Sequence, residues 1–474
     1  MCKPPIAFVL RLLAVLVLPL SFGRAVAQER GSNPRMGDSA TLLTQEEAVR
    51  AALAGNRQLS QAVLEEKTAG ARYRETEAIF LPQVAVSYSA MSTNNPLNAF
   101  GFKLQESSIT AADFDPSHLN HPGGTPNFLT SLDVRQPIFN ADLLYQRKSA
   151  EAAIEVYRFR TQRTREGLEF QVRQAYMGLQ LAEAAVRVLE SSLSIADSFH
   201  RFISDRVTQG MLSRADESNA AVRVAAIRSR LAEARSGVRN ASDMLALLMG
   251  QPAGQRYRVP EELRPSGIPE SEDVSAGVAG GMAFSGGRDS VPTGRADLAA
   301  MQKAIEAADK GIESTRMSSL PRLNAFGSWQ YNDSRMLGFG AHAYLAGVQL
   351  SWDIFKGNSV RNKVATQRLV RDKMVSELAG QREEADLQLR RALRQQDDAR
   401  YAMKESSTAI EAAKESLRIL RDRYEQGMTG NTDVLLAQDQ LETQQLALVR
   451  AVYAYNTAVA YIRFLTVAGT GVKD

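Results

Sequence analysis

Two stretches of this chain contain no proline, namely residues 138–251 and everything after Pro321. Proline breaks the interior of a helix because it has no amide proton and its ring clashes with the preceding turn. Both stretches are rich in Ala, Leu, Glu, Gln and Arg, which favour helix. The sequence therefore predicts long helices over 142–207, 359–423 and 432–465. The first would be roughly 100 Å long, since an α-helix rises about 1.5 Å per residue.

A fourth helix is predicted from Thr44 to about Ile79. Thr44 and Glu47 have the spacing of a capping box, in which each side chain satisfies a free amide at the helix start. Leu81-Pro82 ends this helix, because the residue before a proline avoids helical backbone angles.

Four shorter segments alternate apolar and polar residues, which is the period of a strand with one apolar and one polar face. They predict strands at about 80–90, 130–140, 321–332 and 342–355. The residues 91–127 between the first two strands are expected to form a long polar loop.

Both tryptophans of the chain, Trp329 and Trp352, lie in predicted strands, as do Tyr88 and Tyr331. We expect these four side chains to form an aromatic belt where the strands cross a lipid–water interface. A soluble hairpin with a half-buried face is the alternative.

Several short motifs occur twice, in the same order and at nearly constant spacing, which indicates an internal duplication. Residues 28–250 and 294–474 are each expected to hold a helix, two strands, a long helix, a turn and a final helix. The turns fall near 210 and 427, and the Gly-, Pro- and Ser-rich segment 251–293 is interpreted as a linker. The matched motifs are Leu81-Pro82 with Leu320-Pro321, Ile138-Phe139 with Ile354-Phe355, Gln209-Gly210-Met211 with Gln426-Gly427-Met428, and Asp216 with Asp433.

Residues 1–27 have the pattern of a secretory signal peptide, with basic residues, an apolar run and Ala25-Val26-Ala27 before the cleavage point. Cys2 is the only cysteine and precedes the apolar run, so we expect no lipid anchor on the mature chain. Removing the three basic residues of this segment lowers the formal charge from +4 to +1, so the basic composition does not indicate nucleic acid. No later apolar run is long enough to predict a transmembrane helix.

Four two-faced strands are too few to close a barrel, and open sheet edges cannot face lipid. Cyclic assembly of identical copies is the natural way to close the sheet, and three copies would supply twelve strands. The expected fold is therefore α+β with mostly long α-helices, built from two internal repeats, in which three copies would form a 12-stranded membrane barrel and a ring of long helices that extends away from it.

With these features, the chain resembles the TolC-like outer membrane factors over residues 42–468. The resemblance rests on the signal peptide, the two halves, the Leu-Pro strand starts and the Gly-x-x-Ser turn at Gly210–Ser213. It implies a trimeric 12-stranded outer-membrane β-barrel continued by a 12-helix periplasmic α-barrel. Such a homotrimer would be the exit duct of a tripartite efflux pump in the outer membrane of a Gram-negative cell, with a periplasmic extension. The implied partners are outer membrane lipid, a periplasmic adaptor (membrane fusion) protein and an inner-membrane transporter of the RND or ABC type. No cofactor is implied.

The resemblance also implies roles for the two turns, which would lie at the periplasmic tip and contact the adaptor. Glycine there accepts the left-handed backbone conformation that such a turn needs. The turn and adaptor-contact residues are Gly210, Met211, Leu212, Ser213, Gly427 and Met428.

A periplasmic gate is implied near these turns. Asp433 matches a lumen-facing family position, while Leu436 stands where the family often has a second acid. Asp216 and Tyr424 match a family pair whose hydrogen bond helps to hold the mouth shut. A second family link is missing here, because its positions carry Ala215 and Thr429. The alternative for both aspartates is simple stabilisation of a helix start.

Other functions remain open. The same fold serves as the exit duct of a type I protein secretion system, which is one alternative function. A periplasmic coiled-coil scaffold without a pore is a second alternative, from a different class of protein. No catalytic motif, metal-ligand spacing or phosphate loop is found, so the chain is not expected to be an enzyme. His118 and His121 form an H-x-x-H pattern, which is interpreted as a solvated pair in the loop 91–127.

Overall fold

The computed structural model describes residues 41–260, 262–266 and 290–468. The expected signal peptide and most of the expected linker lie outside these residues. The elements along the chain are β1 (Thr41–Leu42), α1 (Gln45–Gly55), α2 (Arg57–Glu75), a 3-10 turn (Thr76–Ile79), β2 (Gln83–Thr93), α3 (Pro96–Gln105), a second 3-10 turn (Ala111–Phe114), α4 (Pro116–Asn120), β3 (Thr125–Phe139), α5 (Ala141–Thr208), α6 (Arg214–Leu248), β4 (Tyr257–Arg258), α8 (Ala296–Met317), β5 (Arg322–Asp333), β6 (Ala341–Ser351), α9 (Ser359–Glu425) and α10 (Asn431–Thr466).

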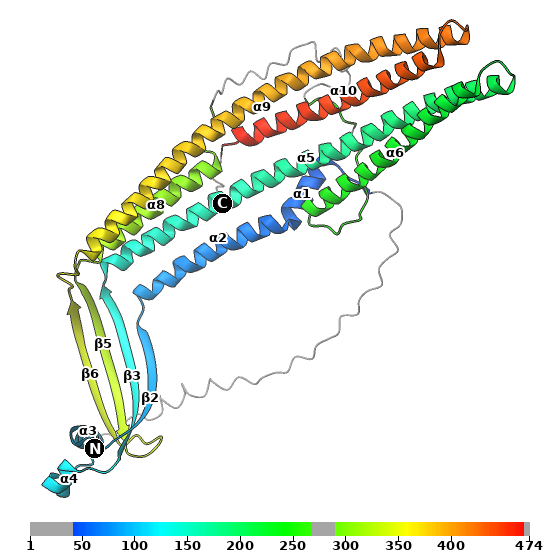
Figure 1. Ribbon diagram of the computed structural model, residues 1–474. Helices are drawn as coiled ribbons and strands as arrows, with labels where there is room; N and C mark the ends of the chain where they lie inside the picture. Colours follow the sequence, from blue (N-terminus) through cyan, green and yellow to red (C-terminus); the bar gives the residue numbers. More distant parts are fainter. Residues whose placement is uncertain (1–40, 261, 267–289, 469–474) are drawn as a thin grey trace. The chain divides into compact units, whose positions relative to one another are not determined.

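The long helices predicted from the absence of proline are confirmed, each to within two residues at either end. Helices α5 and α6 form one antiparallel hairpin, and α9 and α10 form a second (Figure 1). The hairpins lie side by side, mainly through packing of α5 against α10. Both connecting turns lie at the same end of the helices, away from the sheet (Figure 1). Among the described residues, no helix is both long and apolar enough to cross a bilayer.

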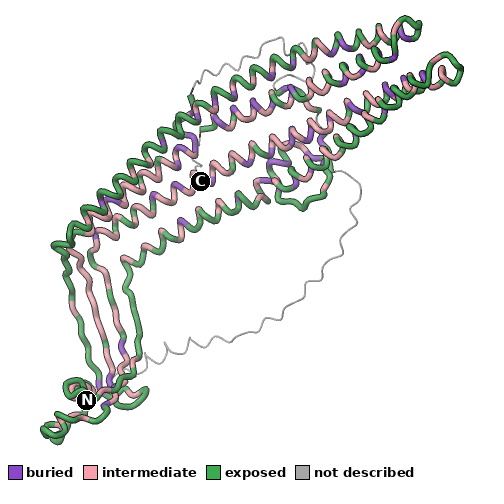
Figure 2. Tube along the Cα trace, viewed as in Figure 1, coloured by how far each residue is buried: buried purple, intermediate pink, exposed green. Residues whose placement is uncertain are grey.

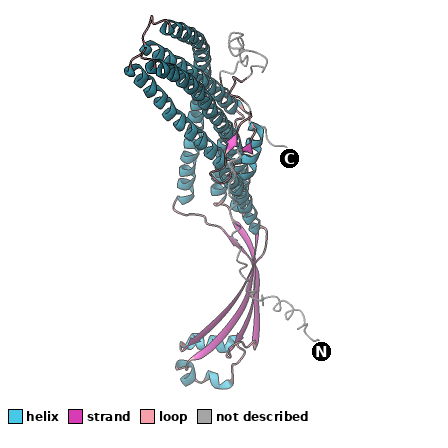
Figure 3. Ribbon diagram, turned by 90° about the vertical axis from the view of Figure 1, so that its right-hand side faces the viewer, coloured by secondary structure: helices cyan, strands magenta, loops and turns pink. Residues whose placement is uncertain are grey.

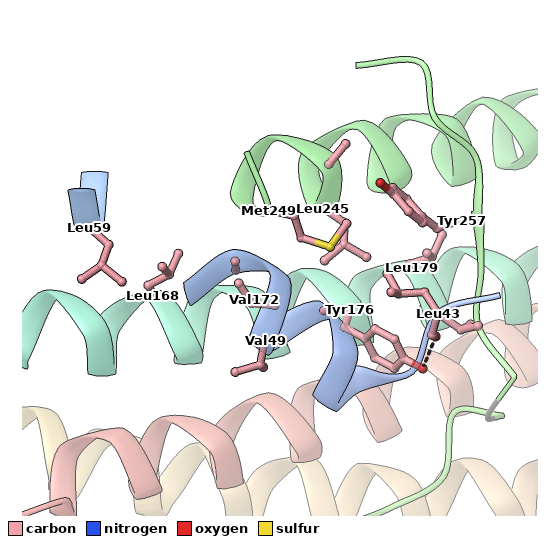
Figure 4. Packing of buried hydrophobic residues seen from close by; sticks show 14 residues of the cluster. Leu43, Val49, Leu59, Leu168, Val172, Tyr176, Leu179, Leu245, Met249 and Tyr257 are labelled. Carbon is pink, nitrogen blue, oxygen red and sulfur yellow. Dashed lines mark hydrogen bonds between the residues drawn. The ribbon is translucent and has the colours of Figure 1, made fainter. Parts of the chain in front are cut away.

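A buried hydrophobic cluster fixes the start of the chain against the first hairpin (Figure 4). Leu179 of α5 and Leu245 of α6 are fully buried in it, and each stabilises the fold by about 1.5–3 kcal/mol. Tyr176 is also fully buried, and its hydroxyl donates a hydrogen bond to the carbonyl oxygen of Leu43 at 3.1 Å. The polar end of this tyrosine is therefore satisfied inside the core.

The helix predicted from Thr44 to Ile79 is wrong in one respect, because it is broken at Asn56. The capping box of Thr44 and Glu47 is present. Asn56 then ends α1 and caps α2, since its Oδ1 accepts from the amide of Leu59 at 3.1 Å. Its Nδ2 donates to the carbonyl oxygen of Leu248 at 2.8 Å, so the break ties the chain to the end of α6.

The break also allows an unusually close approach of two glycines. A Cβ atom placed on Gly55 would lie 2.6 Å from the carbonyl oxygen of Met249, and one on Gly250 would lie 2.1 Å from that of Gly55. Neither contact is possible for a residue with a side chain, so the two backbones can meet only through glycine.

The four longer strands form one antiparallel sheet in the order β2-β3-β5-β6, with the twist visible in Figure 3. The outer strands β2 and β6 are largely exposed, while β3 and β5 are half-buried between them (Figure 2). The sheet continues directly into the helices, because β3 is followed at once by α5.

Two strand-region expectations need correction. The region 91–127 is not a simple loop, because α3 and α4 form there, each opened by an Asx cap followed by proline: Asn95-Pro96 and Asp115-Pro116. Trp352 and Ile354 lie beyond the last residue of β6 rather than within it. The sequence already contains these Asn-Pro and Asp-Pro pairs, which are typical of helix starts, but the polar composition of the region favoured the prediction of a loop.

The expected linker is structured where it is described. Residues Tyr257–Arg258 form β4, which pairs in parallel with β1. Tyr257 and Val259 are buried in the cluster of Figure 4. At the other end, the amide of Val291 donates to Asp386 of α9 at 2.8 Å. Both described ends of the segment are therefore anchored to helices.

Candidate functional site

One face of the sheet carries a row of exposed apolar side chains. Val86, Leu132, Trp329 and Tyr344 are neighbours in register on the four strands. They are 73%, 42%, 42% and 73% exposed, respectively. A contiguous apolar surface of this kind on a protein indicates contact with lipid or with another protein.

The opposite face of the sheet is mostly polar, although Leu345 of β6 lies on it and is 62% exposed. Ser87 and Ser131 share a hydrogen bond of 2.7 Å across β2 and β3, and Ser131 donates to Asp133 at 2.8 Å. Near the far end of the sheet, the buried Asn127 donates to Asn332 at 3.0 Å. The alternation expected from the sequence thus separates an apolar from a polar surface.

The four expected belt residues lie at two different levels. Tyr88 and Tyr331 occupy the same row of the sheet, and Trp329 lies in the adjacent row. Trp352 lies at the helical end, where its indole nitrogen donates to the carbonyl oxygen of Ser319 at 3.0 Å. The first three share one apolar face of the sheet, and Trp352 lies apart from them at the helical end.

The sheet has two free edges. Strands β2 and β6 each have a strand neighbour on one side only, within the described residues. Unpaired backbone groups along an exposed strand are a template for pairing with another chain. The sheet therefore ends in two surfaces suited to further strand addition.

The two tip turns have the same backbone geometry. Gly210 and Gly427 have φ angles of +75° and +72°, in the left-handed region. In the first turn, the amide of Gly210 donates to Val207 and that of Met211 donates to Arg206, both at 2.9 Å. The second turn repeats these bonds at the equivalent positions. Both are Schellman motifs, which satisfy the last carbonyl groups of α5 and α9.

The residues after each glycine differ in exposure. Met211 and Met428 are 64% and 65% exposed at the turns. Leu212 is half-buried and packs against the cluster beneath. Ser213 caps α6, because its hydroxyl oxygen accepts from the amide of Asp216 at 3.2 Å. Among the residues expected to contact the adaptor, the two methionines are thus the large apolar side chains that remain exposed in this chain.

The two aspartates after the turns both stabilise those turns. The Asp216 carboxylate accepts from the hydroxyl and the amide of Ser213, at 2.7 and 3.4 Å. The Asp433 carboxylate accepts from the hydroxyl of Thr429 at 2.6 Å and from the amide of Gly430 at 3.4 Å. Their carboxylates therefore bond within their own hairpins.

The expected hydrogen bond between Asp216 and Tyr424 is not present. Tyr424 is buried, and its ring packs against Phe199 at 5.3 Å between centroids. Its hydroxyl has no hydrogen-bond partner among the residues that the structure describes. Burial, and then the negative charge of Asp216, raise the pKa of Tyr424 above its usual range. The Asp216 carboxylate instead accepts, through Oδ2, from Ser213 of its own capping box.

Tyr424 instead belongs to a hydrophobic cluster that joins the two hairpins near their turns. The buried members are Phe199, Ile203, Ala220, Tyr424 and Val434. One hydrogen bond accompanies this packing, from Nδ2 of Asn431 to the backbone carbonyl of Asp216 at 2.9 Å. The contact between hairpins at the tip is therefore mainly apolar.

Deeper along the hairpins, four charged side chains meet between α6 and α10. Arg223 donates to Asp439 at 2.7 Å and to Glu442 at 2.9 Å. Arg230 lies 2.7 Å from Glu442 and 3.5 Å from Asp439. The side chain of Glu442 is 1% exposed and that of Arg223 is 10% exposed. These four residues are called the charge cluster below.

Sequence reasoning missed the charge cluster, although a signal was present. Arg223 and Arg230 are two helical turns apart, and Asp439 and Glu442 are about one turn apart, so each pair shares a helix face. No short stretch of the sequence indicates that these two helix faces pack against each other. Removing one partner of such a buried pair typically costs about 3–5 kcal/mol.

The described residues contain no group of three or more His, Cys, Asp or Glu side chains placed to hold a metal ion. His118 and His121 line a small hollow of about 270 Å³ beside α3 and α4. Nδ1 of His118 lies 3.3 Å from the carbonyl oxygen of Ala112.

Comparison with known proteins connects this geometry to a family. The model of the family described as outer membrane efflux protein matches residues 48–251 and 290–467. The unmatched stretch falls within the expected linker. The chain is 23% identical over 420 residues to the alkaline protease secretion protein AprF of Pseudomonas aeruginosa, covering 85% of this chain and 80% of that protein.

Two solved structures share the fold. The chain matches CusC with a TM-score of 0.72 and 17% identity, over 91% of this chain and 95% of that one. It matches the outer membrane protein VceC of Vibrio cholerae with a TM-score of 0.70 and 17% identity, over 89% and 95% of the two chains.

Proposed function

Because the chain belongs to the outer membrane efflux protein family, we propose that it is the exit duct of a tripartite efflux pump. Drugs or other small solutes would pass through it from the periplasm to the cell exterior. The observation that carries this proposal is the sheet, which has one apolar face, one polar face and two free edges. A sheet of this kind can enclose water within lipid once its edges are paired.

Three copies pair these edges in the proposed assembly. Strand β6 of one copy joins β2 of the next in antiparallel fashion, so that three four-stranded sheets make a 12-stranded barrel. The hairpins α5/α6 and α9/α10 of the three copies then form a 12-helix barrel in the periplasm. The similar order of elements in the two halves of the chain is consistent with an internal duplication.

The duct needs partners at its periplasmic end. A periplasmic adaptor protein would contact the turns, where Met211 and Met428 are exposed. Methionine suits such a contact because its flexible side chain adapts to different surfaces. An inner-membrane transporter of the RND or ABC type would supply the solute. In this proposal, the chain reaches the outer membrane after cleavage of the signal peptide expected at residues 1–27.

A second candidate function is the exit duct of a type I protein secretion system. The observation favouring it is the similarity to AprF, which is named as a protease secretion protein. Both functions use the same barrel, and no catalytic step is assigned in either. A coiled-coil scaffold without a pore is less favoured, because it would leave the apolar face of the sheet unexplained.

The test is purification of the full chain from membranes, followed by conductance measurements in planar lipid bilayers. We expect a heat-sensitive trimer on gel electrophoresis and stable single channels. A monomeric species that never partitions with membranes would refute the duct. Deletion of the gene, assayed with a panel of toxic compounds and by analysis of secreted proteins, then separates solute efflux from protein secretion.

Asp433 is proposed to form a ring of carboxylates around the periplasmic mouth, which attracts cations and repels anions. We therefore expect Asp433→Asn to lower the cation-to-anion permeability ratio of the reconstituted channel by about two- to fivefold. Thr429→Val is the matched control, because it removes the hydrogen bond to Asp433 but keeps the charge. An equal ratio in Asp433→Asn and the native channel would leave Asp433 with only its role in the turn.

A further inference from the structure

We propose that the charge cluster of Arg223, Arg230, Asp439 and Glu442 is the restraint that keeps the two hairpins of each chain together and so sets the resting width of the duct. This inference rests on the proposed duct function. It assigns regulation of the mouth to residues deeper than the turns, at about 12–25 Å from them along the helices.

The cluster is placed where the hairpins can separate. Helix α5 packs extensively against α10, but α6 and α10 touch over a short stretch only. The four charges bridge these two helices, with both basic residues on α6 and both acidic residues on α10. Moving α10 away from α6 therefore breaks all four contacts together.

The chemistry of the cluster suits a restraint that must open. Hydrophobic packing resists separation, because the exposed surfaces remain apolar in water. Paired charges are different, since water solvates them well once they are apart. Between these two states lies an unfavourable one, in which Glu442 is still buried but has lost its partners. The cluster thus favours two states: one in which the charges are buried and paired, and one in which the helices are separated and water solvates the charges.

The contacts nearer the turns do not provide an equivalent link. The Asp216 and Asp433 carboxylates bond within their own hairpins, and the hydroxyl of Tyr424 has no hydrogen-bond partner in the described part of the chain. Asn431 supplies one cross-hairpin hydrogen bond, to the Asp216 carbonyl. The charge cluster is consequently the largest set of polar contacts between the hairpins in this region.

The test uses the full chain as reconstituted trimer, with single-channel conductance and cellular entry of a large antibiotic as readouts. Glu442→Gln keeps the side-chain shape but removes the charge that both arginines bind. We expect it to raise the mean conductance roughly two- to fivefold, because the population shifts toward separated hairpins. Entry of the antibiotic should increase in parallel.

Three further variants make the result specific. Arg235→Gln breaks a half-exposed pair with Glu190 inside one hairpin, at 2.9 Å, and should leave conductance unchanged. Tyr424→Phe should also leave it unchanged. The double variant Arg223→Gln/Glu442→Gln should raise conductance by less than the two single effects combined, because both side chains act through one shared contact.

Native conductance in Glu442→Gln trimers would overturn the inference, as would an increase of the same size in Arg235→Gln. If Glu442→Gln does not assemble, Arg230→Gln replaces it, since Arg230 is 48% exposed and its loss perturbs packing less. A native chain that forms neither trimers nor channels would instead refute the proposed function itself.

Discussion

Replacing Val86 by arginine should keep the chain out of the assembled outer-membrane trimer, whereas the same change at Ala85 should be tolerated. The two residues are consecutive on β2, both exposed, and point to opposite faces of the sheet. Val86 lies on the apolar face, beside Leu132. An arginine facing lipid near the middle of a membrane barrel costs about 2–4 kcal/mol, and a trimer would bear this cost three times.

The measurement is the yield of heat-sensitive trimer in purified outer membranes, with denaturant midpoints for any trimer that assembles. The Ala85→Arg chain serves as the matched control, because it adds the same charge on the polar face. Equal yields from the two variants would contradict the assignment of the two faces and, with it, the proposed barrel.

Gly250→Ala should destabilise the fold far more than Gly210→Ala. Both glycines end a helix in the left-handed conformation, with φ angles of +71° and +75°. A Cβ atom on Gly210 meets nothing within 4 Å, so the expected loss is only the backbone strain of about 1–2 kcal/mol. A Cβ atom on Gly250 would lie 2.1 Å from the carbonyl oxygen of Gly55, so the backbone must also move. We expect a total of about 2–5 kcal/mol.

Chemical denaturation in detergent, followed by circular dichroism, measures this difference. Gly427→Ala provides a second control, because its Cβ would also meet nothing within 4 Å. A loss at Gly250 no larger than at these two turns would show that α1 and the end of α6 can separate without consequence.

The helices and turns of this chain could be predicted because their causes are local. The absence of proline allowed α5 and α9 to continue, and each turn needed only one glycine with a left-handed backbone. Strand faces followed from alternation for the same reason. Each of these features depends on residues within a few positions of one another.

The predictions that failed depended on contacts between residues far apart in the sequence. Asn56 breaks the first helix partly because its side chain bonds to Leu248, 192 residues away. Tyr257 and Arg258 become a strand only because β1 lies beside them. In α3 and α4, by contrast, the Asx-Pro caps were readable, but polar composition outweighed them.

The sequence by itself determined the long helices, the two-faced strands and the two glycine turns, because helix breaking, alternation and backbone freedom act over one or two helical turns. Only the tertiary structure decided which side chains meet across the hairpins. Asp216 bonds within its own capping box and not to Tyr424, and Arg223 donates to Glu442, which lies 219 residues away. Such pairings depend on how whole helices pack, which no short segment encodes.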